Sequence, residues 1–319
     1  MKKAVCLDGF TTCCDDLSWE DILPLCDLIV FDRTDKHNSE EIISRAYDAE
    51  ILILNKVSIT KEIIDRLPNL KFICLMSTGT DAVDVPYASK KGIPVSNVPV
   101  YSTDAVAQHT FALILSLTND TFNLFNSVKS GDWVKSKDFT YTINSIEDLK
   151  NKNLGLIGYG MIGKKVGEIG KTFGMNIYAN TKTKRDLDGA IYKNLDDMLN
   201  ICQIVSLHLP LYKSNAKMAN KEFFSKMKKG SYFINTSRGG LVDEFALADA
   251  LNNEYLRGAG LDVLGTEPPT EDNPLFYSKN TLITPHVAWA SKTSRKRLIR
   301  IISENIKGYL TNNLQNLVN

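Results

Sequence analysis

Short runs of consecutive apolar residues alternate along most of the chain with longer stretches in which apolar residues recur every three or four positions. The short runs have the length and composition of buried strands, and the longer stretches have the period of amphipathic helices. Strands that alternate with helices in this way predict parallel sheets covered by helices. The predicted strands are residues 4–7, 28–31, 51–54, 72–75, 94–95, 154–157, 176–179, 201–207, 232–235, 258–263 and 282–284.

One long apolar segment stands apart from this alternation. Residues 94–99 carry the chain out of the first group of strands, and Thr103 and Asp104 are suited to cap a helix. Residues 105–117 are apolar over most of the helix circumference, which is typical of a helix buried in the core or against another subunit. We interpret this helix as the connector between two domains, a number that also fits a chain of 319 residues.

Composition and charge narrow the class of protein. The formal net charge is +1, so no global field favours a nucleic-acid or membrane partner. The N-terminal apolar run is too short for a signal peptide, and no run approaches the length of a membrane span. Six scattered cysteines form neither a zinc pattern nor a disulfide framework, which predicts reduced thiols and a cytoplasmic location. Only four histidines are present, which argues against a multi-histidine metal centre, and we predict no metal.

Three glycines follow the strand predicted at residues 154–157, at the point where a helix begins. Gly158 is suited to the tight turn, Gly160 to close approach of a pyrophosphate, and Gly163 to packing of helix against strand. The helix N-terminus then presents backbone N–H groups to phosphate. A glycine-rich turn alone occurs in any α/β domain, but the strand predicted at 176–179 completes the context of a dinucleotide site. The residues assigned to the cofactor at this turn are Gly158, Gly160, Met161, Ile162 and Gly163.

The end of the next predicted strand bears on the choice between NAD and NADP. An acidic residue that bonds the ribose 2′-hydroxyl of NAD is expected about 20 residues after the glycines, but Asn180 and Thr181 stand there. Lys182, Lys184 and Arg185 follow and carry charge that would attract a 2′-phosphate. We therefore favour NADP over NAD, with Thr181 and Lys182 at the cofactor. The alternative is that these cations are ordinary solvated residues of a turn.

Polar residues recur just after successive predicted strands. Because the carboxyl ends of parallel strands share one edge of a sheet, these residues are expected to lie near the glycine turn. Arg238, Glu267 and His286 form a chemically meaningful set among them. A carbonyl that receives hydride must also gain a proton, which an imidazole is suited to give. A carboxylate would orient that imidazole, and a guanidinium would bind a carboxylate or polarise the carbonyl.

These residues resemble a known family, the D-isomer-specific 2-hydroxyacid dehydrogenases, over almost the whole chain. The resemblance implies that Arg238 binds and polarises the 2-oxo acid, that Glu267 tunes the histidine, and that His286 exchanges the proton. It also implies a substrate carboxylate held by backbone near Thr78 and Gly79. Further cofactor contacts are assigned to Thr103, Leu209, Pro210, Thr236 and Asp262. The specific motifs are residues 158–163, 235–240, 261–264 with 267–269, and 284–289.

The family architecture implies two doubly wound parallel-sheet domains. A Rossmann nucleotide-binding domain, residues 100–286, is expected inside a flavodoxin-like substrate domain made of residues 1–99 and 287–319. Members are typically homodimers, which the apolar helix after Ser102 would suit. The chain departs from the family at Thr181, where NAD-using members usually have aspartate.

Residues 98–108 and 286–291 look most like glycerate dehydrogenases, also called hydroxypyruvate or glyoxylate reductases. The expected reaction therefore links hydroxypyruvate or glyoxylate to D-glycerate or glycolate, with NADP or NAD as cofactor. D-lactate, 3-phosphoglycerate and branched 2-hydroxy acids remain open as substrates. A nucleotide-sensing protein of the corepressor kind is the alternative from another class, although a sensor has no need of an intact proton donor with its carboxylate partner.

Overall fold

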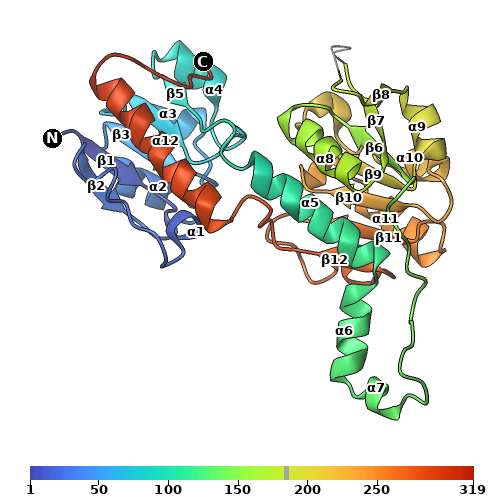
Figure 1. Ribbon diagram of the computed structural model, residues 1–319. Helices are drawn as coiled ribbons and strands as arrows, with labels where there is room; N and C mark the ends of the chain where they lie inside the picture. Colours follow the sequence, from blue (N-terminus) through green and yellow to red (C-terminus); the bar gives the residue numbers. More distant parts are fainter. Residues whose placement is uncertain (183–186) are drawn as a thin grey trace. The chain divides into compact units, whose positions relative to one another are not determined.

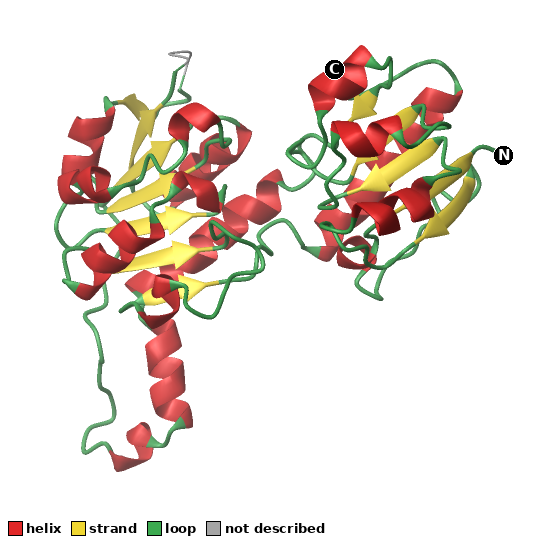
Figure 2. Ribbon diagram, turned by 180° about the vertical axis from the view of Figure 1, so that it is seen from behind, coloured by secondary structure: helices red, strands yellow, loops and turns green. Residues whose placement is uncertain are grey.

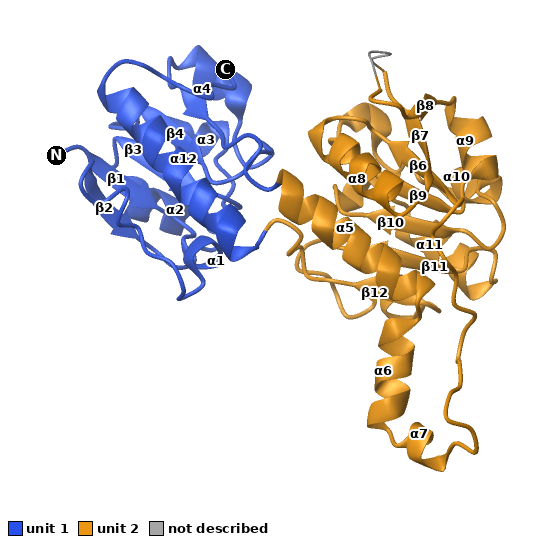
Figure 3. Ribbon diagram, in the orientation of Figure 1, with its two compact units in different colours: residues 1–102, 290–319 blue, residues 103–289 orange. Residues whose placement is uncertain are grey.

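The structure, a computed structural model, describes residues 1–182 and 187–319 (Figure 1). Figure 3 shows two compact units, one made of Met1–Ser102 with Ala290–Asn319 and the other of Thr103–Trp289. The boundaries predicted after residues 99 and 286 each fall three residues before the observed ones. Tyr101 stays with unit 1 because its carbonyl accepts a hydrogen bond from Arg297. Val287 and Ala288 stay with unit 2 because their backbone N–H groups donate to Asp262.

Unit 1 is built on a five-stranded sheet in which every pairing is parallel. The strands β1 (Lys3–Cys6), β2 (Asp27–Val30), β3 (Ile51–Leu54), β4 (Phe72–Leu75) and β5 (Val95–Ser96) lie in the order β2-β1-β3-β4-β5. This is the flavodoxin-like order, which changes direction between β1 and β3. β3 and β4 are buried along their whole length because helices cover the sheet. The helices are α1 (Phe10–Cys13), α2 (Ser39–Ala46), α3 (Lys61–Asp65), α4 (Val85–Lys90) and α12 (Lys292–Leu310).

The last helix returns to the first unit, as the predicted arrangement of domains requires. The Tyr309 ring stacks on Phe72 of β4 with 4.8 Å between ring centroids. Arg295, a residue only 6% exposed, donates from its guanidinium to both carboxylate oxygens of Asp16 and to the carbonyl of Thr12. These contacts tie the segment after β1 to α12, so the two ends of the chain fold together.

Unit 2 contains a seven-stranded sheet, again with parallel pairings throughout. Figure 2 shows its strands side by side between two layers of helices. The direction of the strand order changes between β6 and β9, as in a Rossmann fold. The predicted fold class, two doubly wound parallel-sheet domains, is confirmed. The strands are β6 (Asn153–Ile157), β7 (Asn176–Asn180), β8 (Ile191–Tyr192), β9 (Ile204–Leu207), β10 (Tyr232–Asn235), β11 (Gly258–Leu261) and β12 (Thr281–Ile283), in the order β12-β11-β10-β9-β6-β7-β8.

Two apolar clusters fill the two faces of this sheet. On one face α9 (Leu195–Ile201), α10 (Lys221–Lys226) and α11 (Glu244–Asn252) pack on side chains such as Val205 and Phe233. On the other, α5 (Thr103–Thr118) and α8 (Met161–Thr172) pack on Leu156 and Ile234. Three short 3₁₀ helices, Lys213–Asn215, Gly239–Leu241 and Pro274–Tyr277, complete the unit.

The apolar helix predicted to connect the domains is α5, the first helix of unit 2. Its buried residues, among them Phe111 and Ile114, belong to the cluster that α5 shares with α8 and the sheet. The apolar surface that suggested a subunit interface is therefore used inside unit 2.

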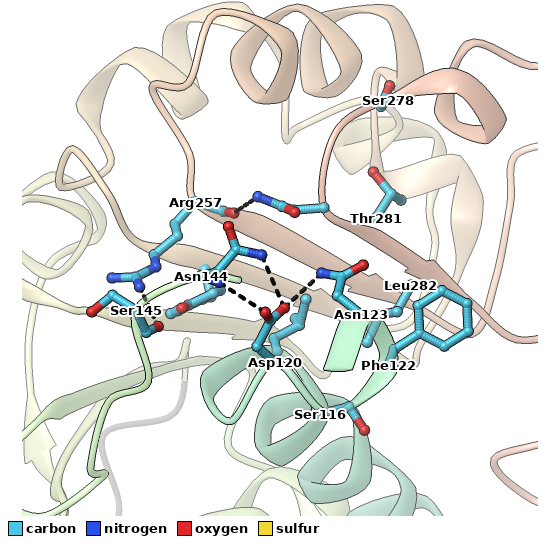
Figure 4. A pocket seen from close by; sticks show the side chains of 13 residues that line it. Ser116, Asp120, Phe122, Asn123, Asn144, Ser145, Arg257, Ser278, Thr281 and Leu282 are labelled. Atoms are coloured by element: carbon cyan, nitrogen blue, oxygen red, sulfur yellow. Dashed lines mark hydrogen bonds between the residues drawn. The ribbon is translucent and has the colours of Figure 1, made fainter. Parts of the chain in front are cut away.

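An arm extends from unit 2 after α5 (Figures 1 and 2). It consists of α6 (Thr121–Lys129), α7 (Asp132–Lys135) and an extended segment that returns to β6. Figure 4 shows the base of the arm, where the Asp120 carboxylate accepts hydrogen bonds from the side chain of Asn123 and from backbone and side chain of Asn144. The sequence did not predict this arm.

One predicted strand differs clearly from the structure. Residues 201–207 were expected as a single strand, but Ile201 ends α9 and only Ile204–Leu207 is extended. Apolar residues continue through the helix end and the turn, so a short apolar run does not separate the two states. The two-residue strand β8 was missed for the opposite reason, since it is too short to show a period. No helix among the described residues is long and apolar enough to span a bilayer.

Candidate functional site

The glycine turn has the geometry expected of a dinucleotide site. Gly158 has φ +91°, and a Cβ placed there would lie 2.3 Å from the carbonyl oxygen of His208. A Cβ on Gly163 would lie 2.3 Å from the carbonyl oxygen of Gly158, so helix and strand approach each other only with glycine there. Gly160 is the N-cap of α8, and a Cβ on it would meet no atom within 4 Å. The space in front of the helix N-terminus is thus open, which fits a pyrophosphate held by the first N–H groups of α8.

The ribose end of the turn lies beyond β7. The Asn180 carbonyl accepts a hydrogen bond from Gly158 N, and its side-chain amide donates to the Lys193 carbonyl. Asn180 is therefore engaged with β8 and the turn, which leaves Thr181 and exposed Lys182 as the described side chains nearest the predicted position. Lys184 and Arg185, which the NADP prediction also used, lie outside the described residues.

Leu209 and Pro210 follow β9, the strand next to β6. The Leu209 side chain lies 2.9 Å from the position of a Cβ on Gly158, so it borders the glycine turn. Thr103 opens α5, which packs along α8. Leu209 and Pro210 thus lie at the β6/β9 switch point, whereas Thr236 and Asp262 follow β10 and β11.

The segment after β10 carries Thr236 and Arg238. The Asn235 side chain accepts from Ser237 N and Ser237 Oγ and donates to the Arg238 carbonyl, which fixes a tight turn. The Thr236 hydroxyl lies 2.9 Å from that of Thr110 on α5. Arg238 Nη1 donates to the carbonyl of Ser237 at 2.8 Å. The turn therefore anchors the backbone of the arginine at the carboxyl edge of the sheet.

His286 and Glu267 meet in the structure. His286 Nδ1 lies 2.6 Å from Glu267 Oε2, and Leu264 N donates to Glu267 Oε1 at 3.2 Å. The two side chains are 23% and 34% exposed, respectively. With Nδ1–H donated to the carboxylate, the imidazole keeps Nε2 for another partner. A histidine so oriented can give or take a proton at Nε2 while the carboxylate stabilises its charged form.

Asp262, immediately after β11, holds the turn in which His286 lies. Its carboxylate accepts from Val287 N and Thr284 Oγ1 at Oδ1 and from Ala288 N at Oδ2. The sequence analysis assigned Asp262 to the cofactor and did not foresee this use of its side chain. Thr284 lies in the predicted motif 284–289 and His109 is one of the four histidines, but neither was given a role. Their contacts with Asp262 join segments that are far apart in the chain.

In unit 1, Thr78 and Gly79 lie in the loop after β4. Ser77 Oγ donates to the Gly79 carbonyl, and Asn97 Nδ2 donates to the Thr78 carbonyl at 2.7 Å. The Thr78 hydroxyl donates to the carbonyl of Val98. Side-chain hydrogen bonds thus occupy the carbonyls of this loop and fix its backbone at the carboxyl edge of the unit 1 sheet.

The other candidate features are a cysteine thiol, possible metal ligands and a cavity away from the glycine turn. Burial raises the pKa of the Cys13 thiol to about 11, so it is not a thiolate at neutral pH. Among the described residues no cluster of three His, Cys, Asp or Glu side chains is placed to hold a metal ion. A cavity of about 290 Å³, lined by Asp120, Arg257 and others, lies at the amino ends of β10, β11 and β12 (Figure 4), the edge opposite the glycine turn.

Comparison with known proteins identifies the family of the chain. Residues 111–288, more than half of the chain, match the family described as "D-isomer specific 2-hydroxyacid dehydrogenase, NAD binding domain". The chain belongs to the D-isomer-specific 2-hydroxyacid dehydrogenases. Members of this family are NAD(P)-dependent oxidoreductases that act on the CH–OH group of their donor, and the chain is an enzyme of this class.

Two relatives and one solved structure illustrate the likeness. A hydroxypyruvate reductase of Blautia hydrogenotrophica is 39% identical over 99% of both chains. A glycerate dehydrogenase of Methylorubrum extorquens is 38% identical over 88% of both. Among solved structures, an acyclic imino acid reductase in complex with NADPH and D-Arg has a TM-score of 0.89, 32% identity and full coverage of both chains.

Proposed function

We propose that this dehydrogenase reduces a small 2-oxo acid, hydroxypyruvate or glyoxylate, to D-glycerate or glycolate. The observation that carries the proposal is the 2.6 Å contact between His286 Nδ1 and Glu267 Oε2, which leaves Nε2 available as proton donor. The identity to hydroxypyruvate reductase and glycerate dehydrogenase over most of the chain supports this substrate class.

The roles of the residues follow from the chemistry of the reduction. The nicotinamide cofactor, when bound, supplies the hydride. His286 protonates the carbonyl oxygen from Nε2, and Glu267 stabilises the imidazolium before transfer. Arg238 binds the substrate and stabilises the charge that develops on the carbonyl oxygen. Backbone N–H groups of Thr78 and Gly79 receive the substrate carboxylate.

The cofactor is held by the residues around the glycine turn. Gly158, Gly160 and Gly163, with Met161 and Ile162, form the pyrophosphate site. Thr103, Leu209, Pro210 and Thr236 contribute further contacts. We propose NADP as the preferred cofactor, because Thr181 brings no carboxylate against a 2′-phosphate and the exposed Lys182 offers a positive charge. The relative solved with NADPH supports the ability of this fold to accept that cofactor.

We further propose that the enzyme is a cytoplasmic homodimer, in which the arm contacts a second copy. In the described part of the chain, 24 large hydrophobic side chains are exposed, and eight of them lie on the arm and its returning segment. Val134 and Phe139 are 92% and 88% exposed. An apolar concentration of this kind is typical of an interaction surface. All six cysteines are free thiols, which suits a reducing compartment.

Initial rates with a panel of acids test the proposed function. Hydroxypyruvate, glyoxylate, pyruvate and 3-phosphohydroxypyruvate would be assayed with NADPH and with NADH, and pyruvate also with ammonium to include imine reduction. We expect the highest kcat/KM with hydroxypyruvate or glyoxylate and with NADPH. Tight cofactor binding without oxidation of either cofactor would favour the nucleotide-sensing alternative. Sedimentation of the same preparation should give twice the mass of one chain.

The variant Thr181→Asp tests the cofactor preference. A carboxylate at this position would accept hydrogen bonds from the ribose hydroxyls of NADH and would repel the 2′-phosphate of NADPH. The ratio of kcat/KM for the two cofactors should therefore move towards NADH by about tenfold, which corresponds to about 1.4 kcal/mol. An unchanged ratio would mean that Thr181 does not face the ribose. Thr172→Asp, at the far end of α8, serves as the control.

A further inference from the structure

His286 lies in a backbone conformation that its own side chain does not favour. Its φ is +55°, in the left-handed region, which is uncommon for a residue with a Cβ. Such a conformation persists only where the surroundings hold it. The backbone N–H of His286 donates to the carbonyl oxygen of Asp262 at 2.8 Å, so the residue that follows β11 is the first element of that support.

The Asp262 side chain supplies the rest. It is 1% exposed, and its two oxygens accept hydrogen bonds from Val287 N at 2.9 Å and Ala288 N at 2.8 Å. These are the two residues that follow His286. The backbone carbonyl and the carboxylate of Asp262 thus bind three consecutive N–H groups. A substitution by another residue changes only the carboxylate and leaves the backbone carbonyl in place.

A hydroxyl and a second histidine support the carboxylate. Thr284 Oγ1 donates to Asp262 Oδ1 at 2.6 Å, and His109 Nε2 lies 2.9 Å from the same hydroxyl. His109 also lies 3.5 Å from Asp262 Oδ1. Because the Thr284 proton is used towards Asp262, its oxygen is left to accept from the imidazole of His109. The turn that carries His286 is therefore braced from α5 through Thr284 and Asp262.

We propose that Asp262 and Thr284 are positioning residues that hold His286 in its left-handed turn, and so set the direction of its imidazole towards Glu267 and substrate. Asp262 acts on the main chain of residues 286–288 through its backbone carbonyl and its carboxylate. The inference rests on the proposed function, because it takes His286 as the proton donor.

Asp262→Asn separates a positioning role from cofactor binding. The amide keeps the volume of the carboxylate but replaces one oxygen by an NH₂ group. That group is a donor and cannot accept the hydrogen bond of Val287 N or Ala288 N. We expect kcat to fall about 10–100-fold, as a small misplacement of a catalytic group does, with the Kd of NADPH, measured by fluorescence titration, within about threefold of the wild type. A Kd raised more than about tenfold with kcat preserved at saturating cofactor would overturn the proposal.

Thr284 supplies a second test if Asp262→Asn folds poorly. Thr284→Val keeps the shape and removes the hydroxyl, and should lower kcat about 3–10-fold; Thr284→Ser restores the hydroxyl and should recover most of that loss. Thr281→Val, at the other end of β12, is the control. Equal kcat in the Val and Ser variants would contradict the role of the hydroxyl.

Hydrogen exchange provides a measurement that needs no turnover. In Asp262→Asn and Thr284→Val, the peptide that contains residues 285–289 should exchange faster than in the wild type, whereas peptides of β6 should not change. Unchanged exchange at 285–289 would contradict the proposal. If wild-type protein turns over no acid of the panel while this exchange difference is seen, the turn is held as inferred and the proposed function is the part that fails.

Discussion

In both units an aspartate at the carboxyl edge of the sheet binds the backbone N–H groups of a neighbouring loop, but the two loops differ in what they carry. In unit 1, Asp8 follows β1 and accepts hydrogen bonds from the backbone N–H groups of Asn55, Lys56 and Val57 in the loop after β3. In unit 2, Asp262 follows β11 and accepts from Val287 and Ala288 in the segment after β12. Each aspartate therefore ties the end of its own strand to the loop that follows the neighbouring strand.

What differs is the content of the bound loop. The loop held by Asp8 lies at the β1/β3 switch point, and the loop held by Asp262 carries a histidine paired with a carboxylate. A carboxylate that accepts backbone N–H groups is thus a structural support in both sheets, and only in unit 2 does it support a group suited to proton transfer. The comparison separates what the architecture needs from what the chemistry needs.

The largest expected effect comes from removing the proposed chemical groups of unit 2. His286→Ala should lower kcat about 10²–10⁴-fold and Arg238→Ala about 10²–10³-fold, because each acts on charge or proton in the transition state. The Kd of NADPH should stay within about threefold in both. The exposed His37→Ala in unit 1 is the matched control. Turnover close to wild type in the His286 variant would contradict its role as the proton donor, and with it the difference drawn between the two units.

The sequence predicted the sheets better than the supports at their edges. The strands Ile51–Leu54, Phe72–Leu75 and Tyr232–Asn235 were predicted to the residue, because buried parallel strands are short apolar runs between polar turns. The pairing of Glu267 with His286 was expected from chemistry, and the structure has them in contact. Asp262 was assigned to the cofactor from the family resemblance, and its backbone contacts were not predicted. Its use depends on N–H groups 25 and 26 residues further along the chain, which no side-chain pattern marks.

The arm was unpredicted for a related reason. Its exposed Phe125 and Trp133 interrupt the amphipathic period that marks a helix packed on its own core. A helix that does not pack on its own core leaves no such period in the sequence. For α5 the sequence left a different question open. A helix that is apolar over most of its circumference can be buried within unit 2 or against a partner, and the pattern does not separate the two.

A smaller effect is expected when the unit 1 support is altered. Asp8→Asn turns an amide group towards the N–H groups of Lys56 and Val57, and loses hydrogen bonds to a charged acceptor. We expect a loss of about 2 kcal/mol in the free energy of unfolding, measured with urea, and a much smaller loss of turnover than in Asp262→Asn. Asp15→Asn, at an exposed position nearby, should cost little. Equal losses of turnover in the two aspartate variants would mean that the loop after β3 also takes part in the reaction.

The last prediction concerns the pH dependence of stability and compares His208 at the switch point of unit 2 with Asp8 at that of unit 1. Burial lowers the pKa of His208, after β9, from 6.5 to about 4, whereas burial raises the pKa of Asp8 above its usual value. For the histidine the unfolded chain binds the proton more readily, so its contribution to stability is complete above pH 6.5 and is lost as the pH falls towards 4. For Asp8 the sign is reversed, and its contribution is lost as the pH rises through its raised pKa.

His208→Gln isolates the histidine, because glutamine can keep a hydrogen bond to Ser206, which lies 3.0 Å from His208 Nε2. The lowered pKa of His208 corresponds to about 2 kcal/mol of unfolding free energy once the partial exposure of the residue is allowed for. The difference in unfolding free energy between wild type and variant, followed by urea denaturation from pH 7 to pH 4.5, should therefore change by up to about 2 kcal/mol against the wild type. A constant difference would mean that the imidazole is hydrated in the folded protein, and that the β6/β9 switch point is open to water even without cofactor.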